Sequence, residues 1–200
     1  MGKLLYITGY ILFRLYFFIF HRWEIKGKNN RPKKGPLIVV ANHVSNLDPP
    51  AVGCLMNRQV YFLAKKELFS NPLFSWVLKK IGVISIKRGT PDRGALKKSL
   101  NILKNNKVLG LFPEGTRNKP GNIGKAKAGV ILIALKSQSP ILPVAIKNIK
   151  SNKQRTKVSI GKPFTLDQFY DKKLTREEKN EAGKLIMNKI KTEFNKINNI

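Results

Sequence analysis

The sequence predicts a single α/β domain with a mixed, mostly parallel sheet flanked by helices, preceded by one hydrophobic, amphipathic helix. Two observations predict this class. From Pro36 onward, short runs of Val, Ile and Leu alternate with helical patterns, and Pro, Gly or Asn stand at the joins. A chain of 200 residues with 42% hydrophobic content is also long enough to bury one substantial core. We therefore expect an amino-terminal helix within residues 1–27 and one domain over residues 28–200.

The most apolar stretch of the chain, residues 4–20, is expected to associate with a membrane. A spanning helix needs about 20 apolar residues, and a central arginine such as Arg14 costs roughly 2.5 to 3.5 kcal/mol. A helix lying in the membrane interface therefore fits better than a span, and a helix packed on its own domain is the third alternative. Helical spacing predicts a polar stripe that faces lipid headgroups: Lys3, Tyr10, Arg14 and His21. Removal of residues 1–27 is then expected to leave a largely soluble domain.

The remaining elements are predicted from hydrophobic runs and helix-start signals. Short runs rich in Val, Ile and Leu predict strands at residues 37–41, 61–64, 83–86, 108–112, 141–146 and 156–160. A polar residue just before proline predicts helix starts at Asp48-Pro49, Asn71-Pro72 and Thr90-Pro91. Residues 175–197 carry apolar side chains on one side, which predicts a final helix that packs on the domain.

The charge of the chain predicts an anionic partner. Lys and Arg total 39 against 11 acidic residues, which gives a formal charge of +28. An anionic membrane surface, nucleic acid, and an acidic protein or phosphorylated substrate all fit such a charge. A compositional bias that serves no site fits many individual lysines equally well. Nucleic acid is the least favoured partner, because the aromatic residues crowd into the amino-terminal helix instead of lining a basic face.

The first candidate constellation joins His43 to Asp48. His43 follows the expected strand 37–41, and Asp48 stands before Pro49 at an expected helix start. Both side chains thus lie on one strand-to-helix loop at the carboxyl edge of the sheet, where open α/β sheets bind ligands. A carboxylate there can orient and charge an imidazole that acts as a general base. The alternatives are an aspartate that only caps the helix and a histidine that only bonds a loop carbonyl.

Two further segments bring basic groups to the same edge. Residues 112–117, Phe-Pro-Glu-Gly-Thr-Arg, leave the expected strand 108–112, and Lys87 and Arg88 end the expected strand 83–86. Arginine can grip a phosphate with two parallel hydrogen bonds. Basic groups beside His43 therefore indicate a phosphorylated substrate whose hydroxyl is deprotonated.

Several reaction classes lack their motifs. The chain has no Gly-x-Ser-x-Gly elbow, no Walker phosphate loop and no Gly-x-Gly-x-x-Gly after a strand. Two histidines and one cysteine do not make a typical zinc site, so no metal is expected. Cys54 lies in an apolar run and is expected to be a buried small hydrophobe. Direct, metal-independent transfer to a hydroxyl is the simplest scheme.

At these residues the sequence resembles the lysophosphatidate acyltransferases (1-acyl-sn-glycerol-3-phosphate acyltransferases) of the glycerolipid acyltransferase superfamily. Residues 42–48 match the Asn-His-x4-Asp block, and residues 82–88 match the second block, Gly-x-x-x-Ile-basic-Arg. Residues 112–117 match Phe-Pro-Glu-Gly-Thr-Arg in full, and residues 142–144 match the fourth block. Ser85 and Ala126 stand where relatives often have aromatic residues, which leaves the acyl-chain preference open.

The resemblance implies a reaction and the residues that perform it. His43 would deprotonate the free hydroxyl of lysophosphatidate, Asp48 would hold the ring, and the oxygen would attack an acyl thioester to give phosphatidate. The donor would be acyl-coenzyme A or acyl carrier protein, with no other cofactor. Substrate binding would fall to Lys87, Arg88, Glu114, Gly115, Thr116 and Arg117.

The resemblance also implies a place of action and leaves rivals. The protein would sit on the cell membrane, peripheral or monotopic, with its catalytic domain on the cytoplasmic side. Another lysophospholipid or glycerol-3-phosphate could be the acceptor. A hydrolase that releases fatty acid and a non-catalytic basic binding module are the remaining alternatives. The sequence makes no prediction of oligomeric state.

Overall fold

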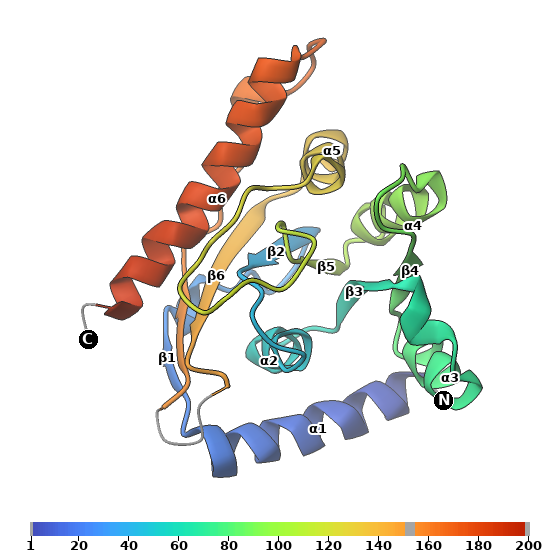
Figure 1. Ribbon diagram of the computed structural model, residues 1–200, viewed down its shortest axis with the longest axis vertical. Coiled ribbons are helices and arrows are strands. Elements are labelled where there is room, and N and C mark those ends of the chain that lie inside the picture. The colour runs from blue at the N-terminus through green and yellow to red at the C-terminus, as the bar shows by residue number, and fades with distance from the viewer. Residues whose placement is uncertain (1, 151–154, 199–200) are drawn as a thin grey trace.

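The computed structural model describes residues 2–150 and 155–198, which form a seven-stranded sheet with helices on both faces (Figure 1). The strands are β1 (Glu24–Lys26), β2 (Leu37–Ala41), β3 (Val60–Lys65), β4 (Ile84–Ile86), β5 (Val108–Leu111), β6 (Ile141–Lys147) and β7 (Lys157–Ile160). The helices are α1 (Gly2–His21), α2 (Asp48–Leu55), α3 (Pro72–Lys80), α4 (Arg93–Lys104), α5 (Ala128–Ser137) and α6 (Arg176–Asn198). Three short 3-10 helices are η1 (Lys28–Asn30), η2 (Lys66–Phe69) and η3 (Asp167–Phe169).

The sheet confirms the predicted fold class. Its strand order is β1-β7-β6-β2-β5-β3-β4, and every pair is parallel except β6 with β7. β2 lies at the centre, where Ile38 is level with Ile141 of β6 on one side and with Leu109 of β5 on the other. The carboxyl ends of β2, β5, β3 and β4 therefore meet at one edge, which is the edge that the sequence assigns to the site.

The core consists of two apolar layers, one on each face of the sheet. Leu37 and Val39 of β2 pack toward α1 and α2, whereas Ile38 and Val40 pack toward α4, α5 and α6. All four side chains are no more than 1% exposed. This alternation follows from the period of two along a strand, and burial on both faces explains why the β2 run has no polar residue.

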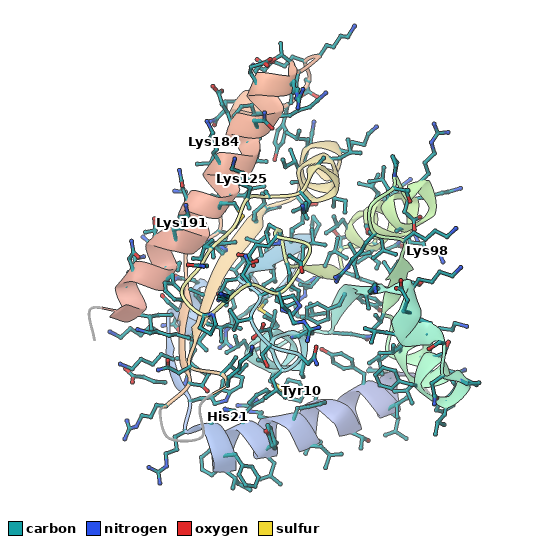
Figure 2. The ribbon with its side chains drawn as sticks, in the orientation of Figure 1. Tyr10, His21, Lys98, Lys125, Lys184 and Lys191 are labelled. Atoms are coloured by element: carbon teal, nitrogen blue, oxygen red, sulfur yellow. The ribbon has the colours of Figure 1, made fainter. Side chains whose placement is uncertain are left out.

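Helix α1 lies along the side of the domain that α2 covers (Figure 1). Phe17 and His21 are buried, and the hydroxyl of Tyr6 accepts a hydrogen bond from the amide of Val60 at 3.1 Å. Tyr10 and His21 lie on the side of α1 that faces α2 and the sheet (Figure 2). The expectation that the polar stripe faces outward is therefore wrong for these two residues. His21 Nδ1 lies 3.1 Å from Thr156 Oγ1, and Tyr10 packs against the core while its hydroxyl accepts a hydrogen bond from Arg14 of the same helix.

The outer side of α1 is a broad apolar face. It consists of Leu4, Ile7, Ile11, Leu12, Phe13, Leu15, Phe18, Ile19 and Phe20, each between 41% and 78% exposed. The helix is 20 residues long and apolar enough to cross a membrane by length and composition. A monomeric soluble protein rarely exposes so large an apolar patch.

Two local departures from the predicted elements have clear causes. Strand β1 is absent from the prediction because three residues with two charges, Glu24 and Lys26, carry no strand signal. It forms by pairing with β7, where Ile25 is level with Val158. Residues before the predicted boundary at 27/28 thus pair with the sheet of the domain. The boundary itself stays a prediction. Helix α4 begins at Arg93, later than predicted, because Asp92 caps it by accepting a hydrogen bond from the amide of Ala95 at 2.9 Å.

The basic residues are spread over the whole molecule. Lys98 lies on α4, Lys125 lies before α5, and Lys184 and Lys191 lie on α6 (Figure 2). The charge is therefore not confined to the edge at which the strand ends meet, as expected for a compositional bias that affects many surface lysines.

Candidate active site

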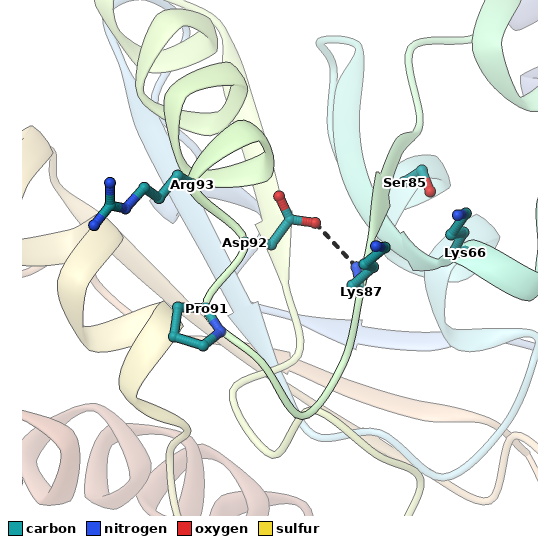
Figure 3. Close-up of a pocket in the computed structure, with 6 residues that line it drawn as sticks. All are labelled: Lys66, Ser85, Lys87, Pro91, Asp92 and Arg93. Atoms are coloured by element: carbon teal, nitrogen blue, oxygen red, sulfur yellow. Dashed lines mark hydrogen bonds between the residues drawn. The ribbon is translucent and has the colours of Figure 1, made fainter.

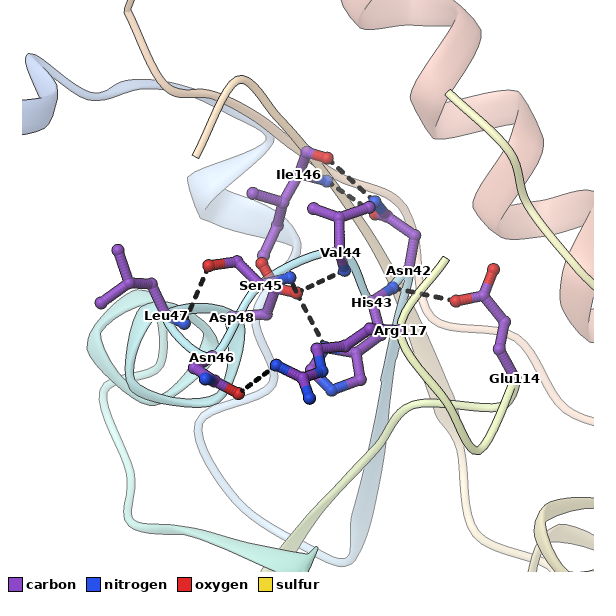
Figure 4. Close-up of polar contacts among 10 residues, drawn as sticks. All are labelled: Asn42, His43, Val44, Ser45, Asn46, Leu47, Asp48, Glu114, Arg117 and Ile146. Atoms are coloured by element: carbon purple, nitrogen blue, oxygen red, sulfur yellow. Dashed lines mark hydrogen bonds and ion pairs between the residues drawn. The ribbon is translucent and has the colours of Figure 1, made fainter. Parts of the chain in front are cut away.

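His43 and Asp48 form a direct pair in the loop from β2 to α2. His43 Nδ1 lies 2.8 Å from Asp48 Oδ2, and the Asp48 side chain is fully buried while the His43 side chain is 12% exposed (Figure 4). Because Nδ1 is held by the carboxylate, Nε2 is the ring nitrogen that remains to take up a proton. This pair meets the requirement for an oriented general base.

The loop fixes one oxygen of the carboxylate. Asp48 Oδ2 also accepts hydrogen bonds from the backbone amides of Val44 and Ser45, each at 2.7 Å. The residue that caps α2 is Leu47, and Asp48 makes no cap hydrogen bond to the helix. The two structural alternatives for this pair are thus excluded: Asp48 is not an N-cap, and His43 bonds a carboxylate instead of a carbonyl.

An aromatic stack supports the imidazole. The His43 ring lies on Phe112, with centroids 4.2 Å apart and planes 23° apart, and Phe112 in turn stacks with Phe62 at 6.1 Å. Phe112 directly follows β5, the neighbour of β2, and Phe62 lies on β3, the next strand along the sheet, so these two strands set the position of the ring. The stack fixes the plane of the imidazole ring, and the contact of Nδ1 with Asp48 fixes how the ring is turned within that plane.

Glu114 lies behind the pair and is only 2% exposed. Its Oε2 accepts from the His43 amide at 3.0 Å (Figure 4). Its Oε1 accepts from the Gly124 amide at 2.8 Å. The His43 carbonyl accepts from the amide of Asn118 at 2.8 Å, which ties the two loops together a second time. Both carboxylate oxygens of Glu114 are therefore committed to backbone groups. Its predicted contact with substrate stays a prediction, and its geometry supports a positioning role.

The rest of this loop presents Arg117 beside the pair. The exposed guanidinium of Arg117 donates to Asn46 Oδ1 at 2.8 Å, which brings it to the loop that carries His43 (Figure 4). Thr116 is exposed as well. Gly115 has φ of 65°, and a Cβ there would lie 3.0 Å from Lys127 Cγ. Glycine is thus required for the turn that aims Arg117.

Lys87 and Arg88 lie at the same edge of the sheet but farther along it. The pairing registers place Ile86 level with Asn42, so Lys87 is level with His43. β4 is three strands from β2, which corresponds to about 14 Å at about 4.8 Å per strand. Both side chains are exposed, and no described hydrogen bond or ion pair joins them to His43. The structure thus places these basic residues across the site from the pair.

A cavity of about 460 Å³ opens beside β4 (Figure 3). The Lys87 amide donates to Asp92 Oδ2 at 3.0 Å, and this bond links the end of β4 to the start of α4. Hydrogen bonds from the amides of Ala95 and Lys87 hold the pKa of Asp92 below its usual value, so the carboxylate stays charged. The cavity is lined by Lys66, Ser85, Lys87, Pro91, Asp92 and Arg93.

Cys54 has no part in this chemistry. It is buried on α2, and its thiol lies 3.7 Å from the carbonyl of Tyr10. Burial raises the pKa of the thiol to about 11, so little thiolate forms at neutral pH. The expectation of a buried small hydrophobe is confirmed.

Three supporting residues were not predicted. The Asn42 side chain makes two hydrogen bonds with the backbone of Ile146, at 2.8 and 2.9 Å, and so fixes the end of β2 to β6. Asn42 and Phe112 belong to the sequence blocks that the prediction used, so their positions were available as a signal. Phe62 carries no such signal, because its role depends on the pairing of β3 with β5.

Comparison with known proteins agrees with this geometry. The family model described as Acyltransferase matches residues 22–147, more than half of the chain. The 1-acyl-sn-glycerol-3-phosphate acyltransferase of Bacillus subtilis (strain 168) is 28% identical over 152 residues, which cover 73% of this chain and 75% of that protein. The protein of the same name from Streptococcus pneumoniae (strain ATCC BAA-255 / R6) is 31% identical over 168 residues, which cover 80% and 60%.

A solved structure resembles the fold as a whole. The 1-acyl-sn-glycerophosphate (LPA) acyltransferase PlsC from Thermotoga maritima superposes with a TM-score of 0.71 at 26% identity, covering 96% of this chain and 78% of that one. The chain spans 75% and 60% of the lengths of the two bacterial relatives, and 36% of the chloroplastic 1-acyl-sn-glycerol-3-phosphate acyltransferase LPAT1 of Arabidopsis thaliana. With the family model, the ordered motifs and the shared fold in agreement, the chain belongs to the acyltransferase family.

Proposed function

We propose that the protein transfers a fatty acyl group from an acyl thioester to the free hydroxyl of lysophosphatidate and so forms phosphatidate. The observation that carries this proposal is the His43–Asp48 pair, 2.8 Å apart, with a guanidinium, Arg117, on the adjoining loop. The names of the relatives and of PlsC support lysophosphatidate as the acceptor.

The proposed reaction needs one base and no covalent enzyme intermediate. His43 Nε2 takes the proton of the acceptor hydroxyl, and the oxygen attacks the thioester carbonyl carbon. The carbon–sulfur bond then breaks, and the leaving thiolate takes this proton from the imidazolium, which restores the neutral His43. Asp48 stays ionised throughout and stabilises the positive ring through Oδ2.

The basic residues would hold the acceptor phosphate. Arg117 is tied to the loop that carries His43, since it donates a hydrogen bond to Asn46 of that loop. Lys87 and Arg88 lie about three strand spacings away, at about 14 Å, a gap that their long side chains can narrow. Gly115 and Thr116 would shape the loop around the headgroup. The donor would be acyl-coenzyme A or acyl carrier protein, and no other cofactor is proposed.

The membrane part of the proposal is carried by the outer face of α1. Its apolar side chains, such as Phe18 at 78% exposed, would lie among the acyl chains of a cell membrane, with the domain on the cytoplasmic side. An interfacial helix suits a substrate that is itself dissolved in the bilayer. The net charge of +28 favours an anionic membrane surface.

The test is a mass-resolved assay that offers acyl-coenzyme A and acyl carrier protein thioesters to a panel of acceptors. The panel contains lysophosphatidate, other lysophospholipids, glycerol-3-phosphate and water alone. Phosphatidate as the main product supports the proposal, and a preferred product from another acceptor selects that rival. Release of free fatty acid without any acylated lipid would instead indicate a hydrolase.

A further inference from the structure

A second exposed apolar surface lies outside the site and outside α1. Leu68 on η2 and Leu73, Phe74 and Trp76 on α3 are 49%, 74%, 47% and 45% exposed. We call these four residues the α3 surface. Four large apolar side chains exposed within nine positions mark an interaction site, since isolated exposed apolar residues are ordinary but clusters are not.

The α3 surface continues the outer face of α1. The two helices are in contact, and a groove of about 240 Å³ between them is lined by Leu4, Leu5, Thr8, Trp76 and Lys80. Leu4 belongs to the exposed face of α1, and Trp76 belongs to the α3 surface. Figure 1 shows α3 beside the amino-terminal end of α1. The two apolar faces therefore meet and can contact one partner together.

Lysines flank the α3 surface. Lys66 precedes Leu68, and Lys79 and Lys80 end α3; all three are exposed, and none forms an ion pair with another described residue. The acidic residue within η2, Glu67, is exposed and pairs with Lys65 at 3.3 Å. Apolar side chains bordered by free ammonium groups match a bilayer whose headgroups are anionic.

We propose that the α3 surface is a second membrane contact, whose partner is an anionic lipid bilayer. This inference rests on the proposed function, in which α1 lies in the membrane interface. It adds which edge of the domain is turned toward the bilayer. η2 begins directly after the carboxyl end of β3, at the edge of the sheet that carries His43. Docking through both helices brings that edge to the bilayer, so a lysolipid reaches Nε2 without leaving the membrane surface.

The first test compares two matched substitutions by flotation with vesicles of phosphatidylcholine and phosphatidylglycerol. Leu73→Glu places a charge on the α3 surface, and Leu132→Glu places one on α5, on the opposite face of the sheet, where Leu132 is 37% exposed. We expect Leu73→Glu to lower vesicle partitioning tenfold or more, equivalent to about 1.4 kcal/mol. Leu132→Glu should change it less than twofold. Equal effects of the two substitutions would overturn the inference.

The second test uses Trp76 as a probe. The chain has two tryptophans, so Trp23→Phe leaves Trp76 as the sole tryptophan, whose emission is selected by excitation beyond the tyrosine absorption band. On vesicles whose phosphatidylglycerol is brominated in its acyl chains, we expect the emission to shift to shorter wavelength and to be quenched. Emission that stays unchanged while the protein floats with the vesicles would contradict membrane contact at α3.

Two controls separate this inference from the proposed function. Phe18→Glu on α1 tests the first membrane contact; if it releases the protein from vesicles and Leu73→Glu does not, α1 alone binds and the inference fails. Turnover of a short-chain acceptor dissolved as monomers should be unchanged in Leu73→Glu, and its loss would assign the surface to folding or catalysis. A Leu73→Glu change from dimer to monomer without vesicles would identify a second copy as the partner and also refute the proposal.

Discussion

Asp48→Asn is informative because the surroundings of the carboxylate dictate how an amide would sit. Oδ2 accepts from the amides of Val44 and Ser45 and from His43 Nδ1, whereas Oδ1 is buried and has no hydrogen-bond partner among the described residues. Only the amide oxygen can accept these bonds, so it takes the place of Oδ2 and the NH₂ group takes the place of Oδ1. His43 therefore keeps its orientation and its proton on Nδ1.

The Asp48→Asn variant loses the negative charge and little else from the catalytic geometry. A hydrogen bond to a charged group contributes about 1.5 to 3 kcal/mol and a neutral one about 1, so the difference is up to about 2 kcal/mol. Applied to the transition state, where the imidazolium forms, this corresponds to a roughly 30-fold fall in kcat/KM. The NH₂ group without an acceptor should also lower the free energy of unfolding by about 1 to 3 kcal/mol.

Steady-state kinetics with lysophosphatidate and an acyl thioester, together with thermal unfolding, check both numbers. Asp48→Ala serves as the comparison, because it leaves two buried amides without an acceptor and should destabilise the protein more. A loss of about 10⁴-fold or more in Asp48→Asn would mean that the ring no longer keeps its tautomer, which refutes the orientation argument. An unchanged rate would show that the charge has no part in catalysis.

Four further predictions concern single groups. His43→Ala should abolish turnover and leave vesicle binding intact; appreciable residual turnover would argue against its role as the base. Glu114→Gln replaces one acceptor by a donor facing a backbone amide, so kcat should fall tenfold or more with the acceptor KM within twofold, and a raised KM alone would instead support substrate binding. Arg117→Ala should mainly raise the acceptor KM, and Arg117→Lys should restore part of it, as measured by initial rates. Burial lowers the pKa of His21 in the folded protein, so below about pH 6.5 the unfolded chain binds more protons than the folded one. The free energy of unfolding should therefore decline as the pH falls through that value. In a pH series of thermal unfolding, the melting temperature of His21→Phe should depend less on pH.

The sequence predicted the central strands because their signal is local. β2 is predicted to the residue, since five apolar residues bounded by Pro36 and Asn42 have the length and the flanks of a strand that is buried on both faces of a parallel sheet. β1 could not be predicted, because its two charged residues are held by pairing with β7, more than a hundred residues away. A contact of that kind leaves no trace in the local pattern of Glu24–Lys26.

The candidate site divides along the same line. The His43–Asp48 contact could be predicted as one of the open alternatives because the two residues are only five positions apart on one loop, where their side chains can meet. The burial of Glu114 was not predicted, because its partners, the amides of His43 and Gly124, belong to the backbone and have no signature in side-chain type. A loop with Glu114 three positions before Arg117 suggests that both side chains bind substrate. Only the fold shows that Arg117 is exposed and that the Glu114 carboxylate is buried.

Helix α1 shows why spacing alone does not assign a partner. The period of 3.6 residues correctly places Tyr10 and His21 on one side, but a polar atom is satisfied by a folded domain as well as by headgroups. His21 Nδ1 lies 3.1 Å from Thr156 Oγ1, and Phe17, one turn earlier, is 1% exposed in the core. Truncating such a phenylalanine costs about 3 to 5 kcal/mol. A chain that begins at Lys28 would lose this contact and β1 as well, so we expect it to unfold more easily instead of becoming a soluble domain. Substitution of Phe18 on the outer face, which touches none of these contacts, is the change that isolates membrane binding.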